Sequence, residues 1–223
     1  VSIHTGRIVG IEALLRWNHP QRGLITPPAF LEVAEETGAI GPIGDWVISQ
    51  AASTLRTLLD DNTLERSVAV HVNVSPRQLS DVGFVERTTN ALAATGVDMR
   101  QLVLEFTEST ALAGNPAVTR SLNALSRLDV RLSIDDFGTG KTSLSVVSSL
   151  PTDFVKLDGS LLQVERPDLS LGLLELGMKF AELVGAEVIV EKVETQSDLD
   201  LARQVGAKFA QGWLFGQPID IRP

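Results

Sequence analysis

The amino-acid sequence predicts an α/β fold and, within that class, a (β/α)8 barrel. Short runs rich in β-branched residues alternate with longer amphipathic stretches. Polar residues lie at or near the end of every short run. A barrel builds its functional site from the carboxyl ends of many strands, whereas an open parallel sheet gathers its ligand at one switch point. Polar residues at the ends of all the runs therefore favour the barrel.

The predicted strands are apolar runs that turn polar near their carboxyl ends. The first three are Arg7–Leu15, Val68–Val74 and Leu102–Phe106, which carry Glu12, Asn73 and Glu105. The next four are Arg131–Ile134, Phe154–Leu157, Glu187–Val190 and Ala207–Ala210. Their polar ends are, in the same order, Asp135 with Asp136, Lys156 with Asp158, Glu191, and Gln211. Each polar group is therefore expected at the same end of one sheet.

Between the strands, apolar residues at helical spacing predict helices, for example over Ile43–Leu59 and Leu171–Val184. No linker rich in Pro, Gly or Ser, no repeat of about 20–50 residues and no low-complexity tract interrupts the alternation. The sequence therefore predicts a single domain over residues 1–223.

The first strand of the expected barrel is not among the runs. A barrel needs eight strands, and the sequence supplies one fewer. Val1–Ile3, followed by a turn at His4-Thr5-Gly6, has the character of the tail of the missing strand. We therefore expect an N-terminally truncated domain, with regulatory domains upstream in the full-length protein.

Composition excludes several classes of protein. The 28 acidic and 19 basic side chains give a net charge of -9, which argues against a partner that is a nucleic-acid polymer. No cysteine is present, so disulfides and thiolate metal sites are excluded. No apolar run approaches the ~18 residues of a membrane span. We expect a cytoplasmic domain without direct membrane insertion, any anchor of the full-length protein lying upstream.

Convergence of the strand ends would gather many carboxylates at one barrel mouth. They are Glu12, Glu105, Asp135, Asp136 and Glu191. So many like charges need counter-charge, and two divalent cations would supply it. Oxygen ligands without Cys or a strand-end His suit Mg²⁺ or Mn²⁺ better than Zn²⁺ or copper. Two such ions indicate attack of an activated water on a phosphodiester, with Lys156 as a positive charge for the phosphate or the water.

Other residues receive structural interpretations. Single acidic residues at strand ends commonly cap helices or face solvent, and Asp153, Asp168 and Asp198 are predicted to do so. His71 shares strand parity with Asn73, which predicts a buried core histidine that points into the barrel. Arg16 and Trp17 lie just beyond Glu12, where they could clamp a phosphate and stack on a base, or where Arg16 could form a surface salt bridge.

Seven motifs, spread over most of the chain, carry a family resemblance. The chain resembles the EAL-domain phosphodiesterases of bacterial cyclic di-GMP signalling. The first four motifs are Glu12-Ala13-Leu14-Leu15-Arg16-Trp17, Asn73-Val74-Ser75, Glu105-Phe106-Thr107-Glu108-Ser109 and Asp135-Asp136-Phe137-Gly138-Thr139-Gly140. The others are Lys156-Leu157-Asp158, Glu191-Lys192-Val193-Glu194-Thr195 and Gln211-Gly212-Trp213-Leu214-Phe215-Gly216. The resemblance implies a (β/α)8-like barrel that hydrolyses cyclic di-GMP to linear pGpG with two Mg²⁺ or Mn²⁺ ions.

The resemblance also implies a role for each matching residue. The ligands of the first metal would be Glu12, Asn73, Glu105 and Asp135, and those of the second Asp135 and Asp136. Glu191 and Lys156, together with Glu12 and Asp135, would form the catalytic set, Lys156 positioning water or phosphate. Arg16, Leu14 and Gln211 would contact substrate. Glu108 would stabilise the glycine-rich loop after Asp136, a loop that the family links to dimerisation and activity, so a homodimer is a further expectation.

The sequence departs from the family pattern in three places. The family's opening strand, which ends in Tyr-Gln-Pro or similar, is absent from this chain. Lys141 stands where the loop commonly has an aromatic residue. Lys192, between Glu191 and Val193, stands at the glycine position of the usual Glu-Gly-Val. Lys192 could pair with a metal-binding carboxylate or attract substrate phosphates, and it would add strain if its position needs a positive φ.

Two alternatives to an active cyclic di-GMP phosphodiesterase remain open at this point. One is a catalytically silent module that binds cyclic di-GMP and signals to a partner. The other is a two-metal enzyme that acts on a different phosphodiester. Turnover of cyclic di-GMP separates the first alternative from the enzyme.

Overall fold

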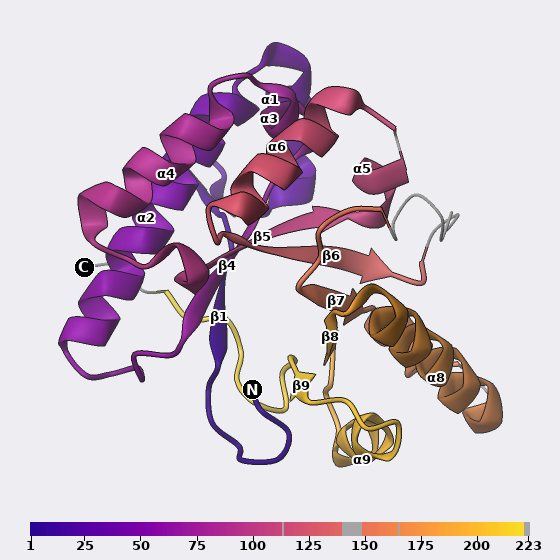
Figure 1. Cartoon of the computed structure of the whole chain (residues 1–223). Helices are drawn as coiled ribbons and strands as arrows, with labels where there is room; N and C mark the ends of the chain where they lie inside the picture. The colour runs from indigo at the N-terminus through magenta and orange to yellow at the C-terminus, as the bar shows by residue number, and fades with distance from the viewer. Residues whose placement is uncertain (113, 140–148, 165, 221–223) are drawn as a thin grey trace.

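A computed structural model describes residues 1–112, 114–139, 149–164 and 166–220. Its main element is a sheet of parallel strands in the order β1-β4-β5-β6-β7-β8-β9 (Figure 1). The strands are β1 (Gly10–Ala13), β4 (Ala69–Asn73), β5 (Leu102–Thr107), β6 (Arg131–Phe137), β7 (Phe154–Leu157), β8 (Glu187–Val190) and β9 (Phe209–Ala210). This open, curled sheet of seven strands is an incomplete (β/α)8 barrel, as the sequence predicts.

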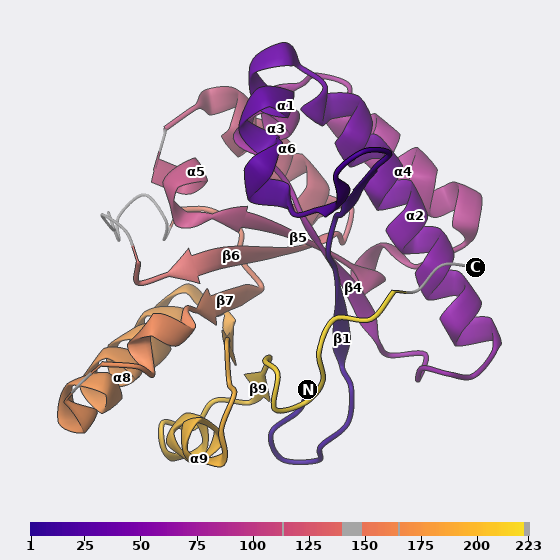
Figure 2. The same cartoon turned by 180° about the vertical axis from the view of Figure 1, so that it is seen from behind.

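Helices cover the outer face of the sheet. The longer ones are α2 (Ile40–Asp60), α4 (Phe84–Thr95), α6 (Pro116–Arg127), α8 (Pro167–Val184) and α9 (Gln196–Gln204). Shorter helical segments are η1 (Pro27–Ala29), α1 (Leu31–Thr37), α3 (Pro76–Ser80), η2 (Met99–Gln101), α5 (Glu108–Leu112) and η3 (Gly159–Leu161). Helices α2, α4 and α6 lie beside β4 to β6, and α8 and α9 lie beside the later strands (Figure 2). None of the helices in the described ranges is long and apolar enough to cross a membrane.

The core lies between the strands and these helices. Leu102, Leu104 and Phe106 of β5 are buried together with Leu55 of α2 and Leu122 of α6. The neighbouring residues of β5 are buried as well, because both faces of a parallel sheet are covered. The carboxyl ends of the strands carry the polar residues of the predicted site, which places the candidate site there.

Side-chain hydrogen bonds fix the backbone at the starts of α3, α9 and β6. Ser75 and Gln78 form a capping box at α3, and Thr195 forms another with Asp198 at α9. The carboxylate of Asp153 accepts a hydrogen bond from the backbone of Leu132. These contacts give Asp198 and Asp153 the structural roles that their sequence context predicts.

The predicted strand boundaries are correct for β7 and β8 and wrong elsewhere. Strand β1 begins at Gly10, later than predicted, and β9 is reduced to Phe209–Ala210. Strand β6 continues to Phe137, three residues beyond the predicted end. The hairpin of β2 (Trp17–His19) and β3 (Gly23–Ile25) follows β1 directly and is an element that the sequence did not reveal.

The segment Val1–Ile3 lies beside β9, on the edge that does not pair with β8. Val1 and Ala210 exchange backbone hydrogen bonds with N to O distances of 2.8 and 3.0 Å. Ser2 forms an antiparallel bridge with Phe209. The segment therefore adds to the sheet as predicted, but it runs antiparallel to β9 rather than as a parallel barrel strand.

Candidate active site

Lys156 lies at the centre of the acidic cluster. Its Nζ is 2.8 Å from Glu191 and 2.9 Å from Glu105, and the side chain is only 1% exposed. Asp135 follows at 3.4 Å and Glu12 at 3.7 Å. The four carboxylates come from β1, β5, β6 and the end of β8, so the sheet brings together residues far apart in sequence. This convergence confirms the reasoning from strand ends.

Glu12 is held between two amide side chains. Asn73 Nδ2 donates to Glu12 Oε1 at 2.7 Å, and Gln211 Nε2 donates to Oε2 at 2.5 Å. Hydrogen bonds from the amides and the charge of Lys156 outweigh burial and lower the pKa of Glu12. Glu12 is therefore an ionised carboxylate at neutral pH. Because Asn73 donates through Nδ2, its carbonyl Oδ1 remains available as an acceptor or ligand.

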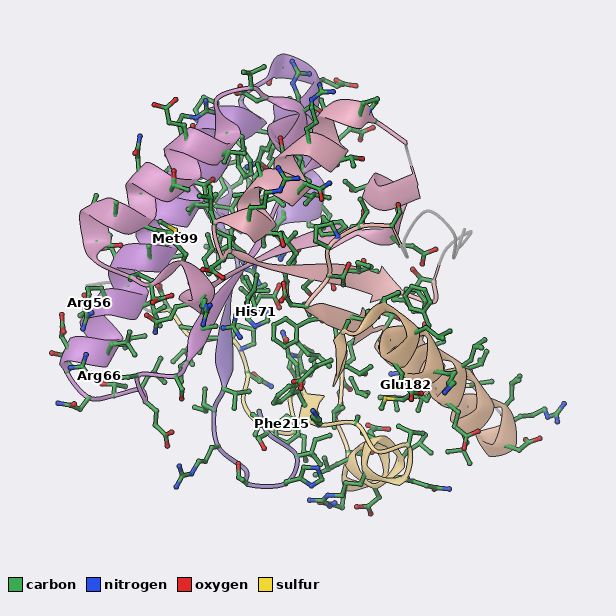
Figure 3. The ribbon with its side chains drawn as sticks, in the orientation of Figure 1. Arg56, Arg66, His71, Met99, Glu182 and Phe215 are labelled. Atoms are coloured by element: carbon green, nitrogen blue, oxygen red, sulfur yellow. The ribbon has the colours of Figure 1, made fainter. Side chains whose placement is uncertain are left out.

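His71 supports Glu105 from within the sheet, near the centre of the molecule (Figure 3). Its Nδ1 lies 2.8 Å from Glu105 Oε1. Burial, together with the charge of Lys156, lowers the pKa of His71 to about 3, so the ring is neutral and Nδ1 shares one hydrogen bond with the Glu105 side chain. Gly10 leaves room for the ring, since a Cβ there would lie 2.9 Å from His71 Nε2. His71 is thus a buried core histidine, as predicted, that also orients a site residue.

The pair Asp135 and Asp136 owes its arrangement to an irregularity in β6. Successive residues of a regular strand point to opposite faces. Here the register between β6 and β7 shifts between Ile134 and Phe137, and Asp136 has a φ of 53°. Oxygen atoms of Asp135, Asp136 and Glu191 lie within 4.8 Å of one another as a result. The shift lets neighbouring carboxylates serve one site.

The cluster carries more negative charge than Lys156 can balance. Burial raises the pKa of Glu105 to about 8 and that of Glu191 to about 7, although Lys156 opposes both shifts. Asp135 Oδ1 is buried and has no hydrogen-bond partner among the described residues. A buried carboxylate oxygen that accepts no hydrogen bond, an all-oxygen donor set and surplus negative charge fit a hard divalent cation.

Without divalent cations, the domain is expected to lose stability as the pH rises from 6.5 to 8. The raised pKa values of Glu105 and Glu191 mean that folding favours their protonated forms, and this contribution is lost as the pH rises above their ordinary value of 4.5 towards 8 and 7. His71 acts in the opposite direction, but only below its ordinary value of 6.5. At about 1.4 kcal/mol per pKa unit, the loss amounts to about 2 kcal/mol.

Urea unfolding in EDTA at several pH values measures this loss directly. Glu105→Gln, which cannot ionise, should flatten most of the slope, and saturating Mg²⁺ should do the same in the unaltered chain. A free energy of unfolding that stays constant or rises between pH 6.5 and 8 in EDTA would contradict the prediction.

Lys192 pairs with Asp158, not with Glu191. Its Nζ forms an ion pair with Asp158 Oδ2, and that carboxylate is only 3% exposed. Asp158 Oδ1 accepts from the backbone of Ser160 and caps η3. These bonds, together with the Lys192 charge, outweigh burial and lower the pKa of Asp158. Sequence reasoning had not given Asp158 a role, although its place two residues after Lys156 at a strand end was the available signal.

The position of Lys192 does require a positive φ. Its φ is 51°, a conformation that costs a residue with a Cβ about 1 kcal/mol. Gly159 lies against it, and a Cβ on Gly159 would collide with that of Lys192. The strain foreseen from the sequence is therefore present at the end of β8, one residue from Glu191.

Lys192→Gly is expected to lower the Mg²⁺ concentration for half-saturation about two- to fivefold. The charges of Asp136 and Glu191 act on Lys192, so its removal leaves the acidic cluster more attractive to a cation. Lys192→Gln should give the same shift with the strained backbone retained. Calorimetric Mg²⁺ titration measures the effect, and Lys208→Gln, whose lysine pairs with Glu187, is the control. Equal Mg²⁺ affinity in all variants would rule out an electrostatic role for Lys192.

Glu108 lies close to Gly138, which follows Asp136 by two residues. It is buried on α5, and its Oε2 accepts a long hydrogen bond of 3.4 Å from the backbone of Gly138. Oε1 is buried without a partner among the described residues. Lys141, the departure from the family pattern in the glycine-rich loop, lies outside the described residues.

The remaining predicted residues line the rim rather than the acidic cluster. Leu14 is 42% exposed and Trp17 is 46% exposed, just beyond the end of β1. Arg16 is half-buried and donates from Nη1 to the backbone oxygen of Leu15 at 2.8 Å. The structure thus leaves apolar groups accessible beside Glu12. The surface salt bridge considered for Arg16 does not occur among the described residues, and its contact with substrate stays a prediction.

Comparison with known proteins identifies similar sequences. The EAL domain family model matches residues 1–218. Over 215 residues the chain is 37% identical to the bifunctional diguanylate cyclase/cyclic di-GMP phosphodiesterase MucR of Pseudomonas aeruginosa, covering 96% of this chain and 31% of that protein. It is 31% identical over 220 residues to the cyclic di-GMP phosphodiesterase PA2567 of the same organism, covering 98% and 37%. The chain thus spans about a third of the length of these two curated relatives.

Solved structures show the same architecture. The PaMucR phosphodiesterase in complex with c-di-GMP aligns with a TM-score of 0.87 at 36% identity, over 95% of this chain and 85% of that one. The EAL enzyme Bd1971, in its form bound to cAMP and cyclic di-GMP, aligns with a TM-score of 0.91 at 33% identity, over 99% and 60%.

Proposed function

The chain belongs to the EAL domain family, and from this membership we propose that it hydrolyses cyclic di-GMP to linear pGpG in a reaction that depends on divalent cations. The observation that carries the proposal is the acidic cluster around Lys156, in which Asp135 Oδ1 is buried and accepts no hydrogen bond from the described residues. MucR and PA2567 carry cyclic di-GMP phosphodiesterase in their names, and the PaMucR structure contains c-di-GMP.

The proposed ligands for the cations come from four strands. Glu12, Asn73, Glu105 and Asp135 would hold the first ion, and Asp135 with Asp136 the second. Two Mg²⁺ or Mn²⁺ ions, when bound, would neutralise the phosphodiester and lower the pKa of a water molecule. Neutral His71 would keep Glu105 oriented, as its hydrogen bond does in this structure.

The remaining groups act on water and substrate. Lys156 presents a fixed ammonium that can hold a phosphate oxygen or the oxygen of the attacking water. The water oxygen forms a bond to phosphorus, one ester bond to a ribose oxygen breaks, and Glu191 accepts the proton that the water loses. The departing ribose oxygen takes a proton from solvent. Arg16 and Leu14 at the rim, and Gln211 beside Glu12, would contact the dinucleotide.

A turnover assay tests the proposal. The protein is incubated with cyclic di-GMP and Mg²⁺ or Mn²⁺, and pGpG is followed by chromatography, with Glu12→Ala as the inactive control. Cyclic di-AMP serves as the comparison phosphodiester. We expect pGpG from the unaltered chain only. Tight binding of cyclic di-GMP without turnover would replace the enzyme with a sensor module, and equal cleavage of both dinucleotides would overturn the substrate assignment.

A further inference from the structure

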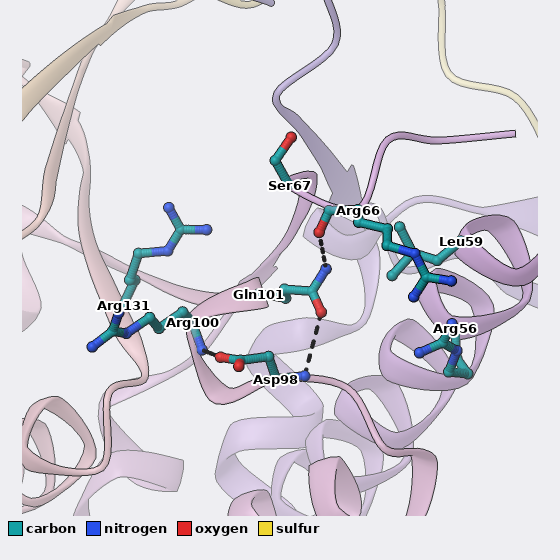
Figure 4. A pocket seen from close by; sticks show the side chains of 8 residues that line it. All are labelled: Arg56, Leu59, Arg66, Ser67, Asp98, Arg100, Gln101 and Arg131. Atoms are coloured by element: carbon teal, nitrogen blue, oxygen red, sulfur yellow. Dashed lines mark hydrogen bonds between the residues drawn. The ribbon is translucent and has the colours of Figure 1, made fainter. Parts of the chain in front are cut away.

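A cavity of about 470 Å³ lies at the end of the sheet opposite the acidic cluster (Figure 4). Ser67, just before β4, Gln101, just before β5, and Arg131, the first residue of β6, all line it. Asp135 follows Arg131 by four residues in β6, which corresponds to about 13 Å along a strand. The cavity is therefore separate from the proposed catalytic site.

The lining of this cavity is strongly basic. Four arginines contribute to it, while Asp98 is the one acidic residue of the lining. They are Arg56, Arg66, Arg100 and Arg131. Figure 4 shows Arg100 and Arg131 on one side of Gln101 and Arg56 and Arg66 on the other. Such a concentration of positive charge stands out in a chain with a net charge of -9.

Two of the arginines are neutralised by partners. Arg56 forms an ion pair with Asp60 on the same helix. Arg100 forms one with Asp129 at 3.2 Å, where both side chains are well exposed. The exposed pair of Arg100 is weak, so its guanidinium can turn to another anion at little cost. Arg56 is held more firmly, since it donates two hydrogen bonds to Asp60.

The other two arginines, Arg66 and Arg131, lack an ion-pair partner among the described residues. The Nε of Arg131 is buried and lacks a hydrogen-bond partner among the described residues. The guanidinium of Arg131 lies 5.4 Å from the ring centre of Phe154, which holds it in place. Burial lowers the pKa of Arg131, while the charge of Asp153 opposes this shift. An anion in the cavity would supply a hydrogen-bond acceptor for this guanidinium.

The floor of the cavity is rigid. Gln101 Nε2 donates to the backbone oxygens of Arg66 and Val68, each at 3.0 Å, and its Oε1 accepts from the backbone of Asp98. These bonds tie the segment before β4 to the segment before β5. The arginines on both sides are thus anchored to fixed backbone, which lowers the entropic cost of binding a ligand.

We propose that this cavity binds a small molecule that carries two or more linked phosphate groups. The planar guanidinium fork matches phosphate oxygens in pairs, and arginines on two sides of the cavity suit more than one phosphate. The volume falls within the range of about 300–1,000 Å³ typical of small-molecule sites. The acidic surface of the rest of the chain disfavours a long polyanion such as nucleic acid.

Inorganic pyrophosphate is the probe for the first test. Calorimetric titration in EDTA removes any cation that could bind pyrophosphate at the acidic cluster. We expect saturable binding by the unaltered chain, and binding at least tenfold weaker in Arg66→Gln and in Arg131→Gln. Arg66 has no ion pair to lose, so its variant should fold even if replacement of Arg131 destabilises the domain; thermal unfolding checks this for both.

Two control variants make the test specific. Arg22→Gln removes an exposed arginine in the turn between β2 and β3 and should bind pyrophosphate like the unaltered chain. Glu12→Ala alters the acidic cluster and should also bind it unchanged, which separates this inference from the proposed catalytic function. Absence of binding at millimolar pyrophosphate, or equal affinity in Arg66→Gln and Arg22→Gln, would overturn the proposal.

Discussion

Asp135→Asn is expected to reduce pGpG formation by a factor on the order of 10² to 10³ while it stabilises the protein in EDTA. The same carboxylate explains both effects. It is the proposed ligand shared by both cations, and its Oδ1 has no hydrogen-bond partner among the described residues. In the absence of cations it adds repulsion to Glu105 and Glu191, whose pKa values it raises, and this repulsion opposes its 3.4 Å ion pair with Lys156, which three other carboxylates share. Its neutralisation should therefore increase the free energy of unfolding by about 1 kcal/mol.

Chromatography of pGpG and urea unfolding in EDTA measure the two effects separately. Asp200→Asn, on the exposed face of α9, is a matched control and should change neither. Asp135→Asn that turns over normally would remove Asp135 from the catalytic set. A lower free energy of unfolding for Asp135→Asn in EDTA would contradict the prediction, because it would show that the Asp135 carboxylate stabilises the folded protein without cations.

Lys156→Met is expected to abolish turnover and to destabilise the protein in EDTA by about 3–5 kcal/mol. The Lys156 side chain is 1% exposed and within 4 Å of four carboxylates, so its loss leaves them without a counter-charge. Methionine fills most of the same volume, so packing contributes little to the change. Mg²⁺ should restore much of the stability but not the activity.

Urea unfolding with and without Mg²⁺ tests this prediction. Lys208→Met removes an exposed lysine that pairs with Glu187, and it should cost less than about 1 kcal/mol in either condition. Unchanged stability of Lys156→Met in EDTA would mean that the cluster does not depend on the ammonium group. Retained turnover would assign the positioning of water or phosphate to another residue.

The sequence was sufficient to predict which strand ends would meet. Apolar runs with polar ends placed Glu12, Glu105 and Glu191 at one edge of the sheet, and the structure brings all of them to Lys156. The prediction succeeded because parallel strands in a barrel share one direction, so that a polar residue at a strand end has little choice of location.

Backbone geometry set the limit of that reasoning. The strand-end position of Asp135 and Asp136 predicted that both join the site, but not the register shift beside them, because that shift arises from pairing with β7. The partner of Lys192 was equally hidden. Sequence neighbours suggested Glu191, whereas the positive φ at Lys192 directs its side chain to Asp158 on the adjacent element.

The hydrogen bond from Gln211 to Glu12 joins residues 199 positions apart. Contacts of such high sequence separation form late, because nearly the whole chain must be ordered before they are made. The two ends of the sheet therefore meet only in the finished fold, and a partly folded chain has no complete set of oxygen ligands. Cation binding should accordingly act on global unfolding, with a gain in stability that grows with the logarithm of the cation concentration. For this domain, the supply of divalent cations would help to set how long the folded molecule survives.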